Sequence, residues 1–276
     1  MIYLEEELYR NDTPGLSYSE MVHLLRSPAH YMEYKENPPE TTPAMRFGSA
    51  VHAAILEPQK YADNYVVFDD SEKIAEIGGT KPRATNAYKE YKAQFELDNQ
   101  GKGVLTVDDS KAITAMAEAV ARHRSASALL AAEGAVEPSF IWEDEVTGTP
   151  LKARLDKLLK SGRVIDIKTC EDARPDAVMR NIWNFRYDVQ AAMYREAVRA
   201  TQGIDDMLPH TLIFVEKSAP HAVAVYELDD LTHEVGEMMR RQAIDTYAEC
   251  VASGVWGAYS DDIQPISLPA WAGRDL

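Results

Sequence analysis

The segment from residue 136 to residue 168 restricts the fold of this 276-residue chain more than any other feature. It contains three runs rich in β-branched, aromatic and aliphatic residues, joined by two turns that each contain glycine: runs 136–142, 151–159 and 164–168, with turns at Glu145-Val-Thr-Gly148 and Ser161-Gly162. Short apolar runs with glycine turns between them predict strands joined as a meander. We therefore expect an antiparallel three-stranded unit here.

Helical patterns surround this strand-rich segment. On the N-terminal side, a capping box at Ser17-Tyr-Ser-Glu20, the pair Ser27-Pro28 and the pair Thr42-Pro43 each predict the start of a helix. Further helices are expected near 84–98, 108–132, 175–201 and 228–250, strands at 104–107, 212–215 and 222–226, and a loop at 69–85. This order predicts an α/β or α+β fold, with helices covering a central mixed sheet and a helical N-terminal elaboration.

Composition predicts a soluble intracellular protein. The first residues turn acidic at Glu5-Glu-Glu7, which is not typical of a signal peptide, and no apolar run approaches the roughly 20 residues needed to cross a bilayer. The two cysteines, Cys170 and Cys250, are far apart in the sequence, which argues against a cysteine-based zinc or iron–sulfur site. We therefore expect a cytoplasmic protein without a membrane partner.

The formal net charge of −16 would repel nucleic acid at long range, but the charge is uneven. Residues 152–199 contain eleven lysines and arginines against seven acidic residues, or +4, which leaves −20 for the rest of the chain. This segment could form a basic patch that confines DNA to one surface. A solvated face of mixed charge is the alternative interpretation, and composition alone favours it.

Two charged residues interrupt an apolar strand at Val164-Ile-Asp-Ile-Lys168. Alternation along a strand puts Asp166 and Lys168 on the same face, beside buried neighbours. Two charges in such a place are costly unless they are paired, and a bound metal ion is one partner that could satisfy them. Three other acid-x-Lys triplets lie on predicted helices, where they indicate only an exposed face.

Asp156 ends the preceding strand, ten residues before Asp166. A tight hairpin would bring the two carboxylates together, where they would repel each other unless a divalent cation shared them. Carboxylate oxygens suit Mg²⁺ or Mn²⁺, and Lys168 would lie near a bound water. A cross-strand salt bridge that pairs Asp156 with Lys168, or Asp166 with Arg154, remains open on spacing alone.

His52 lies one helical turn after Gly48, so the two residues share a face. A glycine inside a helix costs about 1 kcal/mol relative to alanine, which suggests a close backbone approach at Gly48. By itself His52, between Val51 and Ala53, is more typical of a core residue than of a ligand. The other histidines form no HExxH or HxxxH pattern, which disfavours a zinc hydrolase.

Together these motifs resemble the RecB-like nucleases of the PD-(D/E)xK superfamily, and most closely the nuclease domain of RecE (exonuclease VIII). The resemblance rests on an ordered set: Gly48-x-x-x-His52, Asp156, Asp166-Ile-Lys-Thr169 and Gln190-x-x-x-Tyr194, with shorter matches from Gly15-Leu-Ser-Tyr-Ser19 and Pro28-Ala-His-Tyr31 to Leu268-Pro-Ala-Trp271. It implies one exonuclease domain over 1–276. Its parts would be a mainly helical 1–134 that includes the His52 helix, a catalytic core at 135–217, and a C-terminal strand and helix at 218–276.

The resemblance implies a metal-dependent exodeoxyribonuclease that degrades one strand of linear duplex DNA 5′→3′ and leaves a 3′ overhang. The implied metal ligands are His52, Asp156, Asp166 and the backbone carbonyl of Ile167. Lys168 would orient and activate the attacking water, beside Gln190 and Tyr194. Arg154 and Ser19 would hold a 5′ phosphate, for which the two parallel donors of arginine are suited.

The resemblance also implies one or two Mg²⁺ ions per site, which Mn²⁺ could replace because an imidazole is among the ligands. It further implies a homo-oligomeric ring around DNA ends and a RecT-like single-strand annealing partner in a bacterial or phage-infected cell. Another nuclease of the superfamily, either an endonuclease or a single-strand-specific enzyme, and a non-catalytic DNA-binding module of the same fold remain as alternatives. A Cas4-like nuclease is disfavoured because the chain lacks a cysteine quartet.

Overall fold

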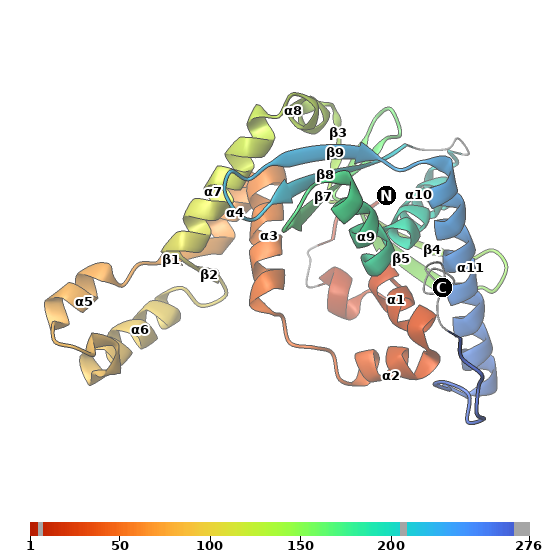
Figure 1. The fold of residues 1–276 in the computed structure, drawn as a ribbon, viewed down its shortest axis with the longest axis horizontal. Coiled ribbons are helices and arrows are strands. Elements are labelled where there is room, and N and C mark those ends of the chain that lie inside the picture. Colours follow the sequence, from red (N-terminus) through yellow and green to blue (C-terminus); the bar gives the residue numbers. More distant parts are fainter. Residues whose placement is uncertain (5–7, 205–208, 268–276) are drawn as a thin grey trace, which may run out of the picture.

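The centre of the protein is a mixed sheet, seen in a computed structural model that describes residues 1–4, 8–204 and 209–267 (Figure 1). Its strand order is β3-β6-β7-β8-β9, in which β7 and β8 are parallel and the other neighbours are antiparallel. The strands are β3 (Gly134–Val136), β6 (Lys157–Leu159), β7 (Val164–Cys170), β8 (His210–Glu216) and β9 (Val223–Glu227). The predicted central mixed sheet with flanking helices is therefore confirmed.

One face of this sheet is covered by helices from the N-terminal half: α3 (Pro43–Leu56), α7 (Val107–Arg122) and α8 (Arg124–Ala131). Ile165 and Ile167 of β7 belong to one buried cluster with Val51 of α3 and Ile113 of α7. Burial of these apolar side chains fixes α3 against β7, because removing apolar surface from water stabilises the fold at about 25 cal/mol per Å². This packing brings the helix that carries His52 to the central strand.

The opposite face is covered by α9 (Pro175–Phe185) and α10 (Tyr187–Gln202). Behind α10 lies α11 (Asp230–Ser253), which also contacts α1 (Tyr18–Arg26) and α2 (Pro28–Glu36). The expected helix starts are confirmed, since α2 and α3 begin at prolines and the backbone N–H of Ser17 donates to the Glu20 carboxylate (2.8 Å). The long α11 also begins and ends close to its predicted bounds.

The predicted three-stranded meander is split between two sheets. Residues 136–142 form the end of β3 and most of β4 (Ser139–Glu143), and residues 151–159 form most of β5 (Pro150–Arg154) and β6. The strands β4 and β5 pair with each other as a separate hairpin, while β3 and β6 pair within the main sheet. The expectation of single continuous strands was wrong because Pro138 cannot donate to a strand ladder and Glu137 adopts a φ of +52°.

The segment from residue 57 to residue 106 projects from the sheet, at the left of Figure 1. Its elements are α4 (Pro58–Asn64), β1 (Tyr65–Phe68), α5 (Ser71–Ile77), a 3₁₀ turn (Pro82–Ala84), α6 (Asn86–Asp98) and β2 (Gly103–Thr106). In the short parallel pair β1–β2, the sequence predicted β2, as a strand at 104–107, but not β1. The predicted loop at 69–85 is largely helical. The Asp69 side chain accepts from the Ser71 backbone N–H (3.0 Å) and so supports the start of α5.

Two predicted helices are each broken into two. At residue 123, the His123 ring accepts from the Ala126 N–H (3.2 Å) and caps α8, so 108–132 is not one helix. At residue 186, Arg186 adopts the left-handed conformation (φ 57°, ψ 42°) and separates α9 from α10. No glycine or proline marks either break, so sequence signals could not locate them. The chain also has a π-helical turn at Leu8–Asp12.

The basic residues of 152–199 do not form one open patch. Lys152 and Lys157 are buried, with their ammonium groups hydrogen-bonded to backbone carbonyls. Other cations of the segment pair with acidic side chains, for example Arg154 with Glu137 and Arg174 with Asp172. The mixed-charge interpretation is therefore the better description of this segment.

Among the described residues, no helix has both the length and the apolar character needed to cross a membrane. The Leu268-Pro-Ala-Trp271 match lies outside the described residues.

His210 at the start of β8 is completely buried, and neither ring nitrogen has a hydrogen-bond partner among the described residues. Burial, with Lys168 nearby, lowers its pKa to about 3, against about 6.5 in an unfolded chain. The unfolded state therefore binds a proton below about pH 6.5 that the folded state does not bind. This contribution to stability is complete above pH 6.5 and is lost as the pH falls toward 3.

His210→Phe should remove this pH dependence while keeping a ring against Tyr194, whose centroid is 5.9 Å away. Between about pH 7.5 and pH 5, we expect the wild type to lose on the order of 2 kcal/mol more unfolding free energy than the variant. Urea denaturation at both pH values measures the difference. Equal losses in the two proteins would show that His210 is protonated equally in the folded and unfolded states.

Candidate active site

The bend shared by two paired segments places Glu137 and Asp156 side by side. The ribbon of β3–β4 and β5–β6 passes from one sheet to the other at residues 137–138 and 155–156. The Glu137 N–H donates to the Asp156 carbonyl (2.9 Å), and the Leu155 N–H donates to the Pro138 carbonyl (3.1 Å). Backbone hydrogen bonds at the bend therefore fix two acidic residues next to each other.

Asp156 also lies against the edge of β7. The antiparallel register pairs Lys157 with Ile165, so one residue further along Asp156 comes opposite Asp166, as the predicted hairpin required. Because β6 begins only at Lys157, the Ile167 N–H has no strand partner on this side and donates to Asp156 Oδ2 (2.7 Å). The N–H and carbonyl of one strand residue point to the same side, so the Ile167 carbonyl faces the same edge.

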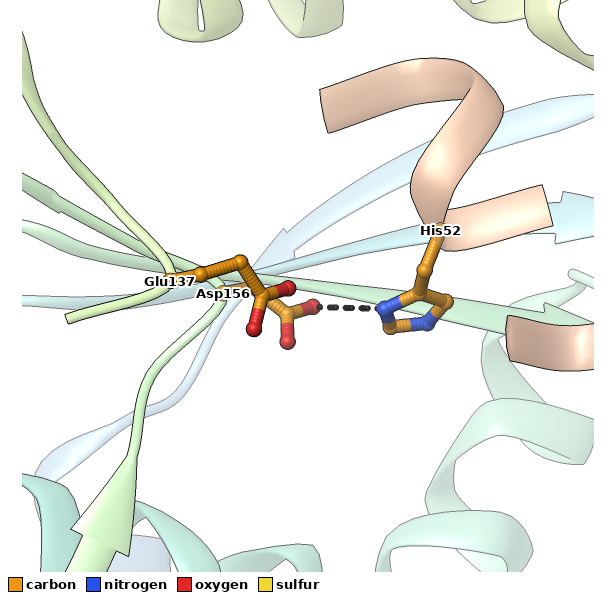
Figure 2. Close-up of side chains that lie close together, drawn as sticks. All are labelled: His52, Glu137 and Asp156. Carbon is orange, nitrogen blue, oxygen red and sulfur yellow. Dashed lines mark ion pairs between the residues drawn. The ribbon is translucent and has the colours of Figure 1, made fainter. Parts of the chain in front are cut away.

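His52 reaches this edge from α3. Its Nδ1 lies 3.3 Å from Asp156 Oδ2, and Figure 2 shows the imidazole and the Glu137 and Asp156 carboxylates turned toward one another. Each of the three residues offers a ligand atom, and these atoms all lie within 4.8 Å of one another. Among the described residues this is the one group of three or more histidine, cysteine or acidic side chains so arranged.

Asp166 and Lys168 lie beside this group. Lys168 Nζ is 2.5 Å from Asp166 Oδ2, and Asp166 is 1% exposed. Asp166 Oδ1 is buried without a hydrogen-bond partner among the described residues. The sequence predicts Asp166 in one ligand set with His52 and Asp156. The structure groups Glu137 with His52 and Asp156, and it places Asp166 next to them in an ion pair with Lys168.

Two residues of α10 contact the Lys168 ammonium, and a third residue of the same helix holds one of them in place. Lys168 Nζ donates to Gln190 Oε1 (2.9 Å), and Gln190 Nε2 donates to the Tyr194 hydroxyl (2.8 Å). The ammonium also lies 4.4 Å from the centre of the Tyr187 ring, which is a cation–π distance. Gln190 and Tyr194 were expected beside Lys168, and Tyr187 was not.

The electrostatics of the cluster show how crowded its charges are. Burial and the charge of Asp156 raise the pKa of Glu137 to about 7, against the opposing effect of Arg154. Burial raises the pKa of Asp166 to about 6, although Lys168 opposes the shift. Burial lowers the pKa of His52, but the charge of Asp156, the hydrogen bond to Asp156 and the charge of Asp166 together outweigh burial and raise the pKa to about 9. The three carboxyl groups therefore do not all ionise easily in each other's presence.

A divalent cation fits this arrangement. It would offset the mutual repulsion of Glu137, Asp156 and Asp166, and it would supply a partner for the buried Asp166 Oδ1. Carboxylate oxygens with one imidazole and a backbone carbonyl form a donor set that suits Mg²⁺ or Mn²⁺. The residues that would hold the ion are His52, Glu137, Asp156, Asp166 and the carbonyl of Ile167.

The predicted phosphate-binding residues lie at different places. Arg154 is at the edge of the cluster, where its Nε donates to Glu137 (2.6 Å). Ser19 is exposed on α1, next to Tyr18, whose hydroxyl donates to the carbonyl of Phe185 at the end of α9. Arg154 therefore borders the cluster, whereas on α1 it is Tyr18, the neighbour of Ser19, that makes the contact with the end of α9.

Gly48 does not show the expected close backbone approach. A Cβ built on Gly48 would meet no heavy atom within 4 Å. The glycine lies one turn from His52 and leaves open space on that side of α3. The prediction was wrong because a glycine in a helix does not always mark a close contact within the chain. It can also leave room on the helix surface for another molecule.

Sequence reasoning missed Glu137 because it read residues 136–142 as one strand. The available signal was an acidic residue directly before proline within an apolar run, Val136-Glu137-Pro138, which indicates an interrupted strand. Tyr187 was missed because its contact with Lys168 depends on the left-handed turn at Arg186.

The fold and site together define a class: an α/β protein whose central mixed sheet carries a cluster of carboxylates, one histidine and one lysine at the edge of its middle strand. The sequence places the chain within it. Residues 17–269 match the PDDEXK-like domain of unknown function DUF3799, so the chain belongs to this family and has a PD-(D/E)xK fold.

Solved structures agree with this fold. A crystal structure named "Putative exonuclease" from Eubacterium rectale is similar over 97% of both chains, with a TM-score of 0.61 and 15% identity. A phage-related exonuclease from Haemophilus somnus 129PT matches more weakly, with 13% identity, 67% of this chain and 94% of that one covered, and a TM-score of 0.31. The first likeness supports the fold alone, and the second is too weak to add to it. No curated protein matches the chain.

Proposed function

We propose that the protein is a metal-dependent exodeoxyribonuclease that degrades one strand of linear duplex DNA in the 5′→3′ direction. The observation that carries the proposal is the convergence of His52, Glu137 and Asp156 beside the buried Asp166–Lys168 pair. The PD-(D/E)xK fold supports it, since nucleases of this superfamily use divalent metals. Mg²⁺ is the proposed ion, with Mn²⁺ as an effective replacement.

The residues divide into a ligand group and a positioning group. His52, Glu137, Asp156, Asp166 and the Ile167 carbonyl form the ligand group. A divalent cation bound there would lower the pKa of a water molecule and offset the charge that develops on the scissile phosphate. Glu137 is the addition that the structure makes to the ligands expected from sequence.

Lys168 is the proposed residue that orients and activates the attacking water. Gln190 and Tyr187 fix the direction of its ammonium group, and Tyr194 fixes Gln190 in turn. A positive charge held in advance next to the phosphate stabilises the negative charge of the transition state without reorganisation during the reaction. The buried Asp166 beside it keeps Lys168 protonated, since its charge raises the lysine pKa against the effect of burial.

The finer parts of the proposal follow from the resemblance to RecE. A 3′ overhang as product, a homo-oligomeric ring and a RecT-like annealing partner in the cytoplasm of a bacterial or phage-infected cell belong to it. Arg154 and Ser19 would hold the 5′ phosphate. For Arg154 this requires the guanidinium to exchange Glu137 for phosphate, which becomes easier when Glu137 binds a cation instead.

The test is digestion of a linear duplex labelled at one 5′ or one 3′ end, with Mg²⁺, with Mn²⁺ and with EDTA. In either metal we expect the 5′ label to be released as mononucleotides. The complementary strand should persist and form the 3′ overhang, and EDTA should abolish all products. A covalently closed supercoiled circle should stay intact, because it offers no end.

Other products would identify the alternatives. Cleavage of the closed circle would indicate an endonuclease, and digestion of single strands alone would indicate a single-strand-specific nuclease. Binding of the duplex without hydrolysis in either metal would indicate a DNA-binding module and would refute the proposed activity.

A further inference from the structure

The turn between α9 and α10 is formed by a residue whose type does not favour its conformation. Arg186 has a φ of 57° and a ψ of 42°, in the left-handed region of the backbone map. Glycine occupies this region freely and asparagine more readily than most residues, whereas arginine does so at a cost in free energy. Residues held in costly conformations persist only where their surroundings stabilise them, and they cluster at functional sites. The contacts of Arg186 therefore bear on the function of this turn.

The Arg186 side chain stabilises the turn through two contacts. Its guanidinium donates two hydrogen bonds to the Asp188 carboxylate, from Nε to Oδ1 (3.1 Å) and from Nη2 to Oδ2 (2.6 Å). The same guanidinium lies 4.6 Å from the centre of the Trp183 ring. The side chains of Arg186 and Asp188 are only 13% and 3% exposed, so water competes little for this bidentate pair. A glycine would adopt the conformation at a lower cost but would supply neither contact.

Two neighbouring helices contact the same turn from outside. The Tyr18 hydroxyl of α1 donates to the carbonyl of Phe185, which is the last residue of α9. On the side of α11, a Cβ added to Gly236 would lie 2.1 Å from the backbone carbonyl oxygen of Asp188. Because α1 and α11 both pack so closely here, a shift of the turn would require one of these helices to move as well.

The turn places Tyr187 against the Lys168 ammonium. The Arg186 carbonyl accepts from the backbone N–H groups of Val189 (3.0 Å) and Gln190 (3.1 Å), so α10 begins directly from this residue. Tyr187 is the first residue of α10, and the centre of its ring lies 4.4 Å from Lys168 Nζ. A left-handed residue changes the direction of the chain, and the orientation of Tyr187 therefore depends on the conformation of Arg186.

We infer that Arg186 and Asp188 are positioning residues for the proposed hydrolysis, because the turn that they hold places the Tyr187 ring against the Lys168 ammonium. The inference rests on the proposed function, in which Lys168 acts on the attacking water. An ammonium that has lost the ring contact stays charged but is freer to change direction. It must then reorganise as the transition state forms, and it stabilises the developing charge less well.

Arg186→Asn combined with Asp188→Asn tests the inference. Asparagine tolerates the left-handed conformation, and replacing both residues leaves neither charge buried without its partner and does not change the net charge. With linear duplex DNA in Mg²⁺, the single-turnover rate constant should fall about 2- to 30-fold, the loss expected for one cation–π contact. The enzyme concentration that gives half of the maximal rate should not change, because neither residue is proposed to contact DNA.

A double-mutant cycle separates positioning from a general loss of structure. Tyr187→Leu removes the ring, and in this background the Arg186→Asn and Asp188→Asn pair should have little further effect on the rate constant, because all three residues act through one contact. The same fold loss in the wild-type and Tyr187→Leu backgrounds would overturn the inference, since the ion pair would then act by another route.

An NMR signal provides a readout that does not depend on DNA cleavage. In protein labelled with ¹⁵N-lysine, the Lys168 ammonium signal is identified by its loss in Lys168→Ala. The Tyr187 ring current should displace its proton resonance upfield, and Tyr187→Leu should remove that displacement. The Arg186→Asn and Asp188→Asn pair should remove it as well. A Lys168 resonance that stays at its wild-type position in this double variant would contradict the inference.

The chain offers a matched control in Arg174 and Asp172. These two residues form the same kind of bidentate pair, also two residues apart, at the start of α9, but the arginine side chain is 74% exposed. Arg174→Asn combined with Asp172→Asn should keep the wild-type rate constant and the wild-type Lys168 resonance. Urea denaturation of each variant measures how much of the protein is folded under the assay conditions.

The two proposals can fail separately. A protein that hydrolyses duplex ends equally fast with and without the Arg186–Asp188 pair keeps the nuclease proposal and loses the positioning role. A protein that hydrolyses nothing, but whose Lys168 resonance moves when the pair is replaced, loses the nuclease proposal and keeps the dependence of the Tyr187 contact on Arg186.

Discussion

Lys168→Ala should reduce hydrolysis of linear duplex DNA by on the order of a thousandfold, because removal of one preorganised donor from an active site typically costs a hundred- to a thousandfold in rate. The loss should fall on the rate constant, and metal binding should not weaken, because Lys168 is not among the proposed ligands and its removal takes away a positive charge that competes with the metal ion for Asp166. Single-turnover digestion measures the rate constant of hydrolysis. Titration with Mn²⁺, followed by its paramagnetic signal, measures the affinity of the site for the metal ion.

Two variants control this experiment. Lys160→Ala removes an exposed lysine that pairs with Glu133 at the far end of β6, and it should retain full activity. Glu137→Gln should weaken Mn²⁺ binding, with a loss of activity that is partly recovered at high Mn²⁺, as expected of a ligand. A Lys168→Ala protein that keeps more than a tenth of the wild-type rate would remove Lys168 from the chemistry.

Gly236→Ala should destabilise the protein by about 3 kcal/mol or more, toward the upper end of what overpacking of a well-packed interior costs. A Cβ on Gly236 would lie 2.1 Å from the backbone carbonyl oxygen of Asp188. The Cβ would be fixed to the backbone of α11, and the carbonyl oxygen belongs to the backbone of α10. Neither can therefore move aside as the end of a flexible side chain would. Guanidinium denaturation measures the effect, and unchanged stability would mean that the helices do not approach so closely.

Gly48→Ala is the matched helical glycine and should act in the opposite direction. Nothing lies within 4 Å of its Cβ, so the substitution should stabilise α3 by about 1 kcal/mol. If DNA passes close to α3 near His52, the same variant should also lose activity despite its greater stability. That combination would separate a functional glycine from a structural one.

Local signals predicted much of this protein, because they depend on residues close in the sequence. The capping residues Ser17, Ser27 and Thr42 placed three helix starts, and alternation placed Asp166 and Lys168 on one face of a strand. The ten-residue spacing of Asp156 and Asp166 predicted their hairpin. These patterns act within a few residues, where backbone geometry leaves few alternatives.

Local sequence signals did not locate two breaks in the backbone: one has no glycine or proline to mark it, and the other lies within a segment whose pattern predicts a strand. Arg186 takes a left-handed conformation that its residue type does not favour, stabilised by the Asp188 ion pair and the Trp183 ring. Glu137 sits at a bend that only the crossing from one sheet to the other explains. Both breaks lie at the candidate site, and both place a residue there, Tyr187 and Glu137, that the sequence pattern did not indicate.

The sequence by itself determined which residue types could perform the chemistry: two acids and a lysine on adjoining strands, a histidine on a helix, and the PD-(D/E)xK pattern that relates them. Only the tertiary structure decided which atoms meet, because convergence depends on packing between segments more than eighty residues apart. The apolar contact of α3 with β7 brings His52 to Asp156, and the bend of two paired segments brings Glu137 there as well. Packing also pairs Asp166, which spacing assigned to the same group, with Lys168 beside this cluster.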